Sequence, residues 1–228
     1  MNKHRARAIV FIGLLCQVCN TDANLETIFT RTYVQNGWRD LESVSGSGSN
    51  LKQTRVIRGL LPKLISRLQV KKILDAPCGD FYWMSKIALP PIQYIGVDIV
   101  RELITKNKEH YGVTAHRIFL QRNIIRDVLP HADLIICRDC LVHLSFRDAL
   151  AALRNFKKTG ARYILTTTFT SRTTNLDTQS PLWRPLNLTK PPFNFPKPLL
   201  LINEACTEKN GIYTDKSLGL WRLSDVIS

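Results

Sequence analysis

Five short apolar segments, separated by stretches with helical spacing, constrain the fold of this chain more than any other feature. The strands that they predict lie at residues 72–76, 93–99, 117–122, 132–137 and 162–169. Helices are predicted at residues 53–68, 81–88 and 100–111 and from Ser145 to Gly160, the first of them kinked or split at Pro62. Strands that alternate with helices indicate an α/β fold with a parallel sheet, and the wholly apolar run 132–137 is expected at its centre.

Three further segments complete the predicted domain. Residues 24–50 are polar and end in Ser-Gly repeats, which predicts a loop or a flexible cover. Residues 170–198 are rich in proline and lack any helical period, so we expect a long loop. Residues 199–203 and 217–223 are predicted to form an antiparallel pair at the edge of the sheet.

The N-terminus resembles a secretory signal peptide. Lys3, Arg5 and Arg7 precede an apolar stretch over residues 8–19, and small residues then allow cleavage after Ala23. Residues 1–23 are therefore predicted as a signal and residues 24–228 as the domain. The alternatives are that this segment is an uncleaved anchor or that translation starts further downstream. If the segment is not a signal peptide, the protein is expected in the cytoplasm. The apolar stretch is too short to span a bilayer, and no transmembrane helix is expected.

Charge and cysteine content limit the partners. The formal net charge is +14, and the chain stays strongly basic without residues 1–23, which favours an acidic partner such as a nucleic acid. No block of like charges concentrates this excess. Cys137 and Cys140 form a C-x-x-C pair, but no second pair or His pair completes a zinc set, so no metal is expected. Their odd separation along a strand would place the two thiols on opposite faces.

Polar residues follow four of the predicted strands. The turn after the first strand, residues 75–80, keeps one glycine where a dinucleotide-binding fold has three, and its proline has no N–H for a pyrophosphate. Asp98 ends the second strand, where a carboxylate can accept hydrogen bonds from both hydroxyls of a ribose. Asn123 follows the third strand, where a polar side chain can meet an adenine, and Arg138 follows the fourth. Because ligands bind at the carboxyl ends of parallel strands, we expect one shared site.

The segments ILDAPCGDFYWM, YIGVDIV and ADLIICRDCLVHLS resemble the class I methyltransferases that use S-adenosylmethionine (SAM). The resemblance covers roughly residues 28–228 and is strongest to a branch with the signature LDAPCGDFxWM, which does not specify a substrate. It implies a Rossmann-like sheet of seven strands in the order 3-2-1-4-5-7-6, with strand seven antiparallel and helices on both faces. It also implies SAM as the cofactor, which carries no phosphate and so suits the turn. Asn123 departs from the Asp that many members of the wider class have.

The residues expected to contact the cofactor lie in and beside these strand ends. They are Asp75, Ala76, Pro77, Cys78, Gly79, Asp80, Trp83, Asp98, Ile99, Asn123, Ile124 and Arg138. Asp139 and His143 are candidates for a general base, which is needed if the acceptor is a hydroxyl or a protonated amine. His143 could instead help to start the following helix. Trp183, Arg184 and Asn187 are candidates for substrate contacts, if the proline-rich segment is a lid rather than a loop packed over the sheet edge.

The sequence thus predicts a methyltransferase that acts on a small molecule or a glycan. Two alternatives stay open. The basic charge favours a nucleic-acid methyltransferase, although no aromatic residues are interleaved with a basic stripe. Export would instead favour a non-catalytic protein that kept the fold and binds SAM or a nucleotide, because SAM is made in the cytosol.

Overall fold

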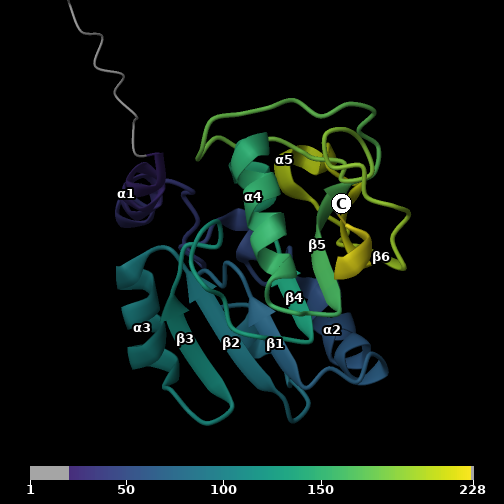
Figure 1. Cartoon of the computed structure of the whole chain (residues 1–228). Helices are drawn as coiled ribbons and strands as arrows, with labels where there is room; N and C mark the ends of the chain where they lie inside the picture. The colour runs from purple at the N-terminus through teal and green to yellow at the C-terminus, as the bar shows by residue number, and fades with distance from the viewer. Residues whose placement is uncertain (1–20, 227–228) are drawn as a thin grey trace, which may run out of the picture.

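A seven-stranded sheet forms the centre of the molecule in the computed structural model, which describes residues 21–226 (Figure 1). The strands are β1 (Lys72–Asp75), β2 (Gln93–Asp98), β3 (Arg117–Gln121), β4 (Leu134–Cys137), β5 (Tyr163–Phe169), β6 (Leu200–Asn203) and β7 (Lys216–Arg222). Their order is β3-β2-β1-β4-β5-β7-β6, and β7 runs antiparallel to both of its neighbours. The predicted topology is confirmed.

Helices cover both faces of this sheet. They are α1 (Thr21–Val34), α2 (Arg55–Arg67), α3 (Arg101–Tyr111), α4 (Phe146–Lys157) and the short, kinked α5 (Glu208–Gly211). Successive residues of a strand point to opposite faces. Accordingly, Leu74 packs with the residues of α4 that include Phe156, and Ile73 packs with those of α2 that include Ile65. Figure 1 shows α4 crossing in front of the sheet.

The central strand and the helix ends agree with their sequence signals. All four residues of β4 are buried, as a strand covered on both faces requires. The backbone N–H of Asp148 donates to Ser145 Oγ at 3.1 Å, which is the expected N-cap of α4. Helix α2 is not split at Pro62, and the loss of one intrahelical hydrogen bond is tolerated there because the helix buries an apolar stripe against the sheet.

Two sequence predictions of local structure are wrong. Residues 24–34 are helical rather than irregular, since Leu25, Phe29 and Tyr33 recur at every fourth position and pack inward between polar neighbours. Residues 81–88 form no α-helix, and only a single 3₁₀ turn occurs at Met84–Lys86. Phe81 has a φ of 57°, outside the helical region, because its ring is buried against Tyr94, Tyr111 and Phe119.

The predicted signal peptide receives no support from the structure. Residues 1–20 lie outside the described residues, and α1 runs through the predicted cleavage point after Ala23. In the part that is described, no helix is long and apolar enough to cross a membrane.

The proline-rich segment, residues 170–198, contains no helix or strand, as predicted, yet its second half buries several side chains. Leu186, Leu188, Phe193 and Phe195 enter the core on the α4 face of the sheet. The indole N–H of Trp221 donates to the carbonyl of Pro196 at 2.7 Å. Phe193, Phe195 and Trp221 are therefore core residues, and the second half of the segment is a packed cover rather than a free loop.

Candidate functional site

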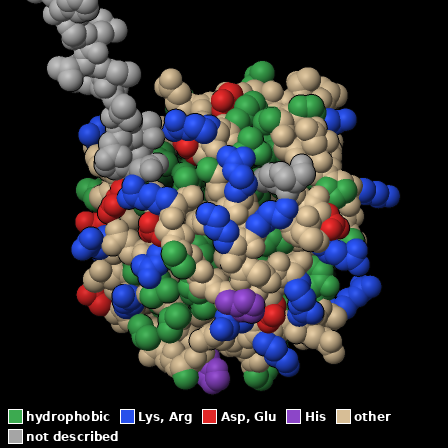
Figure 2. Space-filling model, in the orientation of Figure 1, with side chains coloured by type: hydrophobic (Ala, Val, Ile, Leu, Met, Phe, Trp, Pro, Cys, Tyr) green, Lys and Arg blue, Asp and Glu red, His purple; other side chains and the backbone are tan. Residues whose placement is uncertain are grey.

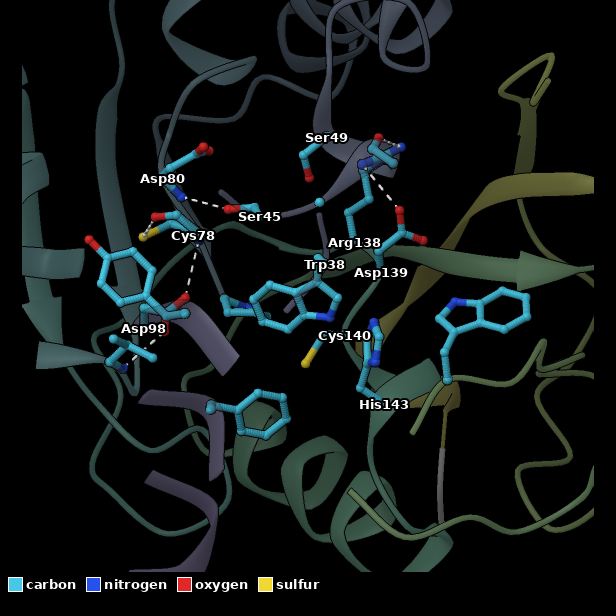
Figure 3. Close-up of a pocket in the computed structure, with 18 of the residues that line it drawn as sticks. Trp38, Ser45, Ser49, Cys78, Asp80, Asp98, Arg138, Asp139, Cys140 and His143 are labelled. Carbon is cyan, nitrogen blue, oxygen red and sulfur yellow. Dashed lines mark hydrogen bonds and ion pairs between the residues drawn. The ribbon is translucent and has the colours of Figure 1, made fainter. Parts of the chain in front are cut away.

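A cavity of about 410 Å³ opens at the carboxyl ends of β1, β2 and β4. Its lining includes most of the predicted site residues, which are Asp75, Pro77, Cys78, Gly79, Asp80, Trp83, Asp98, Ile99, Asn123, Ile124, Arg138, Asp139, His143 and Trp183. Figure 3 shows Asp80 and Asp98 towards one side of this cavity, with Asp139 and His143 towards the other. The topology thus gathers side chains from four strand ends, as the sequence predicts.

Asp98 is held by the backbone on both of its oxygens. Its Oδ2 accepts the N–H of Gly79 at 3.2 Å, and its Oδ1 accepts the N–H of Val100 at 3.0 Å. Burial raises the pKa of this carboxyl to about 6, and the backbone donors oppose a larger rise. At pH 7 the side chain is therefore mostly an anion, with further lone pairs for donors on a ligand.

Asp75 has a different environment from Asp98. The Tyr94 hydroxyl donates to its Oδ2 at 2.6 Å, and both side chains are buried. Burial raises the pKa of Asp75 to about 7, an effect that the Tyr94 hydrogen bond reduces but does not cancel. Asp75 is thus half protonated near neutral pH, and it supplies less negative charge to the cavity than Asp98 does.

The Ser-Gly loop, residues 43–49, lies over the cavity and is tied to the turn after β1. Ser43 Oγ donates to Asp80 Oδ2 at 2.7 Å, and the N–H of Asp80 donates to Ser45 Oγ at 2.9 Å. Gly79 has a φ of 54°, and a Cβ at this position would collide with Ser45 Oγ. The one glycine that the turn keeps is therefore required both for its conformation and for the close approach of this loop.

The opposite side of the loop is tied to the C-terminal part of the chain. Arg138 Nη2 donates to the carbonyl of Gly48 at 2.7 Å, and Ser47 Oγ donates to Glu208. Two hydrogen bonds join Gln53 to Thr207 just beyond the loop. The Ser-Gly loop therefore lines the cavity and is tied to the chain on both of its sides.

A buried ionic cluster of Arg138, Asp139, Glu204, Glu208 and Lys216 stands beside the cavity. Arg138 donates to both oxygens of Glu204, at 2.8 and 2.9 Å, and its Nη1 lies 3.2 Å from Asp139 Oδ2. Lys216 Nζ lies 2.6 Å from Asp139 Oδ2 and 3.5 Å from carboxylate oxygens of Glu204 and Glu208. With two cations and three anions, the cluster carries a formal charge of −1.

Asp139 is poorly suited to accept a proton. Burial would raise the pKa of its carboxyl, but Lys216 and Arg138 outweigh that effect and hold the pKa well below its usual range. The backbone is also fixed, with a φ of 49° and an N–H that donates to Thr167 Oγ1 at 2.8 Å. Asp139 is therefore a permanent, immobile anion, which suits electrostatic stabilisation better than general-base catalysis.

His143 has the properties of a base. Its Nδ1 lies 2.9 Å from the carbonyl of Pro181, which can only accept, so Nδ1 carries the proton and Nε2 keeps a free lone pair. Burial lowers the pKa of the imidazole, which is therefore neutral at pH 7. The ring lines the cavity and meets the indole of Trp38 edge-on, with centroids 6.0 Å apart (Figure 3).

Asn123 carries an unsatisfied donor at the cavity wall. Its Oδ1 accepts the N–H of Ile125 at 2.9 Å, which fixes the orientation of the amide, and the side chain is buried. Within residues 21–226, its Nδ2 has no hydrogen-bond partner. A buried donor without a partner costs free energy, and an acceptor atom on a ligand would remove this cost.

Three predicted site residues lie outside the cavity lining. Ala76 is buried in the core. Arg184 donates to the carbonyls of Leu141 and Leu176, and Asn187 Nδ2 donates to two backbone carbonyls, of Thr170 and Arg172. Arg184 and Asn187 thus hold the proline-rich segment together, and their predicted contact with substrate stays a prediction.

The expectation that Cys137 and Cys140 lie on opposite faces is wrong, because both side chains are buried in the same core cluster. Strand β4 ends at Cys137, and the positive φ of Asp139 turns the chain back. Both thiols are free and buried. No cluster of metal-ligating side chains occurs in the described part of the chain.

Sequence reasoning missed several residues of the site. Trp38, Tyr213, Glu204, Glu208 and Lys216 lie at or beside the cavity but follow no predicted strand of the parallel sheet. Phe29 also lines it, and its place in the pattern Leu25, Phe29, Tyr33 is a signal that could have found it. The ionic cluster has no such signal, because its members are brought together by the pairing of β7 with both β5 and β6.

No protein-family model matches the sequence, and no characterised protein matches it by sequence. Among solved structures, N-methyltransferase NodS from Bradyrhizobium japonicum WM9, in complex with S-adenosyl-L-homocysteine (SAH), is 16% identical with a TM-score of 0.50. The match covers 62% of this chain and 74% of that one. Human N-acetylserotonin methyltransferase in complex with SAM is 16% identical over 88% of this chain and 67% of that one, with a TM-score of 0.49.

An O-methyltransferase family protein from Burkholderia thailandensis is also similar, with 15% identity, 53% of this chain covered and a TM-score of 0.44. This chain spans 39% of the length of that protein. At such identities a likeness shows the fold alone, and only the TM-score of the NodS match reaches 0.5 among these three. Together with the strand order, that match shows that the chain has the Rossmann-like fold of the class I SAM-dependent methyltransferases.

Proposed function

We propose that this protein is a SAM-dependent methyltransferase that acts on a small molecule. The observation that carries the proposal is the cavity itself, where a buried carboxylate at the end of β2 and an unpartnered amide donor after β3 face one space. These two groups match the two parts of an adenosine. The ribose presents hydroxyl donors, and the adenine ring presents nitrogen acceptors.

The residues present fit the cofactor. Asp98 would accept hydrogen bonds from the ribose hydroxyls while keeping its two backbone donors. Asn123 Nδ2 would donate to a ring nitrogen of the adenine, which satisfies the orphaned donor. The turn at Gly79 lets the backbone approach closely, and it lacks the glycine-rich cradle that a pyrophosphate needs.

When bound, SAM supplies a methyl group on a positively charged sulfur. Asp139 provides a fixed negative charge at the end of β4, and the buried ionic cluster has a formal charge of −1, so this side of the cavity favours a cation. The Ser-Gly loop lines the cavity and is held in place at both of its ends. Alignment of the reacting atoms in such a site is worth up to about 7–11 kcal/mol of the barrier.

His143 is the residue that we propose as general base. His143 lines the cavity, and its neutral state at pH 7 leaves Nε2 able to take a proton from a hydroxyl or an ammonium acceptor. Asp139 is less suited to this role because its pKa is held low. We therefore assign Asp139 to electrostatic support and His143 to proton transfer.

Calorimetric titration of the full chain tests this proposal. We expect SAM and SAH to bind with micromolar affinity, whereas NAD and ATP bind at least ten times more weakly because the turn offers no phosphate cradle. A circular dichroism spectrum of each sample shows that the protein is folded. Tighter binding of NAD than of SAM, or no binding of SAM by folded protein, would contradict the proposal.

Nucleic acid is the second candidate acceptor, and the net charge of +14 favours it. Figure 2 shows Lys and Arg side chains spread over a whole face of the molecule, with Asp and Glu among them, rather than gathered into one stripe. A small molecule therefore ranks first. Salt-dependent binding of RNA or DNA at physiological ionic strength would reverse this ranking.

A further inference from the structure

The part of the cavity beyond the strand ends is lined by two groups of aromatic side chains. The first wall consists of Phe29 from α1 and Trp38, whose stacked rings have centroids 6.5 Å apart. The second wall consists of Phe169, Trp183 and Tyr213, whose centroids lie 4.9 to 5.7 Å from one another. His143 touches the first wall through Trp38.

These aromatic residues do more than fill the core. Phe29, Trp183 and Tyr213 are only partly buried, and they pack at the edge of the main core cluster while facing the cavity. Aromatic faces favour other flat rings through stacked or edge-on contacts. Two aromatic walls with a histidine beside them therefore suit a planar, aromatic acceptor better than a sugar with many hydroxyls or a flexible chain.

Lys209 adds a positive charge to this part of the cavity. Its Nζ lies 5.5 Å from the ring centroid of Trp183 and 5.8 Å from that of Tyr213, and the residue is exposed. Among the described residues it pairs with no carboxylate, whereas Lys216 contacts three. An exposed ammonium held over two aromatic rings by cation–π contacts is free to neutralise an anionic group on a ligand.

We propose that the methyl acceptor is a planar phenol that carries a carboxylate. The ring lies between the two aromatic walls, the phenolic hydroxyl faces Nε2 of His143, and the carboxylate pairs with Lys209. This assignment rests on the proposed methyl transfer from SAM and names its substrate class. It makes Lys209 and Trp183 the residues that determine specificity.

The reaction at this site balances without any further reactant. The phenolic hydroxyl gives its proton to Nε2 of His143, and its oxygen forms a bond to the methyl carbon of the sulfonium donor. The bond between that carbon and sulfur breaks, and its electron pair stays on the sulfur. The products are an aryl methyl ether, a neutral thioether and an imidazolium, which then releases the proton to water.

The test is a calorimetric titration of the full chain, saturated with SAH, with 4-hydroxycinnamate and with its neutral methyl ester. Lys209→Gln should weaken the binding of 4-hydroxycinnamate about two- to fivefold and leave the affinity for the ester and for SAH unchanged. Trp183→Leu should weaken both phenols. Lys197→Gln, at an exposed position outside the cavity lining, is the matched control and should change none of the affinities.

The outcomes separate this inference from the proposed function. If SAH binds but neither phenol does, or if Lys209→Gln weakens acid and ester equally, the substrate class is wrong while the cofactor assignment stands. If folded protein does not bind SAH, the proposed function itself fails. Incubation with SAM and 4-hydroxycinnamate should yield the aryl methyl ether, identified by mass spectrometry.

Discussion

The two ends of the cavity are built in different ways. The end that we propose for the cofactor consists of Asp75, Gly79, Asp98 and Asn123, which lie at or just after the carboxyl ends of three neighbouring parallel strands. Asp98 and Asn123 are held there by hydrogen bonds from backbone N–H groups. The end that we propose for the acceptor is lined by side chains from α1, the chain after it, the proline-rich segment and the region before β7. Strand ends thus position the side chains proposed to hold the cofactor, whereas one helix and several irregular segments supply the surface proposed to contact a substrate.

Between the two ends stands the ionic cluster, which belongs to both. Arg138 reaches the Ser-Gly loop over the cofactor end, and Lys216 fixes Asp139 on the side of the acceptor. A substitution in the cluster should therefore alter both cofactor binding and catalysis. A substitution confined to one end should alter only the property that depends on that end. The predictions below test this division, from the largest expected effect to the smallest.

His143→Ala should distinguish the two ends most clearly, because it should lower kcat without weakening cofactor binding. Loss of the base should lower kcat by about 10²–10⁴-fold for the acceptor that the protein methylates, with little change in SAH affinity. In the parent protein, kcat should fall as the pH is lowered, because protonation of the imidazole removes its lone pair, and this dependence should disappear in the variant. His131→Ala, at an exposed position outside the cavity lining, is the control. Equal losses of SAH affinity and kcat would contradict the division of the cavity into two separate ends.

Glu204→Ala should affect both ends. Its removal leaves the guanidinium of Arg138 buried without its bidentate partner, which should cost roughly 3–5 kcal/mol of unfolding free energy in urea denaturation. Glu208→Ala should cost less, because this carboxylate is more exposed and lies 3.5 Å from Lys216.

If Glu204→Ala does not fold, Glu204→Gln keeps the shape of the side chain and allows SAH binding and kcat to be measured. Both should be reduced. An unchanged affinity for SAH together with unchanged stability would show that the cluster does not connect the two ends.

The pH dependence of SAH binding should report on the cofactor end alone. Burial raises the pKa of Asp98 to about 6, and the ionised form accepts the ribose hydroxyls best, so affinity should fall as the pH drops below 6, by at most about tenfold per pH unit. Asp75→Asn removes the group whose pKa is raised to about 7 and should leave this fall in place. If the fall in affinity vanishes in Asp75→Asn, the titrating group is Asp75 rather than Asp98, which would contradict this prediction.

The same division separates what the sequence could predict from what it could not. Short apolar runs that alternate with helical spacing predicted the parallel strands, and the resemblance to the class I methyltransferases implied their order, which the structure confirms. Because the carboxyl ends of parallel strands meet at one edge, the sequence also predicted that the polar residues at those ends line one cavity. Helix α1 was missed because its apolar residues are single positions in a polar segment. Trp38 and Tyr213 reach the cavity from irregular segments, whose course depends on packing that has no periodic signal.

In the proline-rich segment, residue type alone did not indicate the structural role of Arg184 and Asn187. Arg184 and Asn187 carry the donors that substrates often need, and this suggested contact with substrate. In the folded chain they donate to backbone carbonyls, which the irregular loop does not pair within a helix or a sheet. Trp183, their neighbour, does line the cavity. A sequence shows which side chains can donate hydrogen bonds. The backbone carbonyls of a packed loop also need donors, and they decide which of these side chains remain free to contact a ligand.

The central claim is that Asp98 at the end of β2 holds the ribose of SAM. The most direct measurement is the dissociation constant of SAM for the full chain and for Asp98→Ala, determined by calorimetry, with Asp225→Ala at an exposed position outside the cavity lining as the control. The variant should bind about 10–100-fold more weakly, which corresponds to roughly 1.5–3 kcal/mol for hydrogen bonds to a charged group, and the control should bind as the parent does. Equal affinity of folded Asp98→Ala and parent protein for SAM would contradict the account.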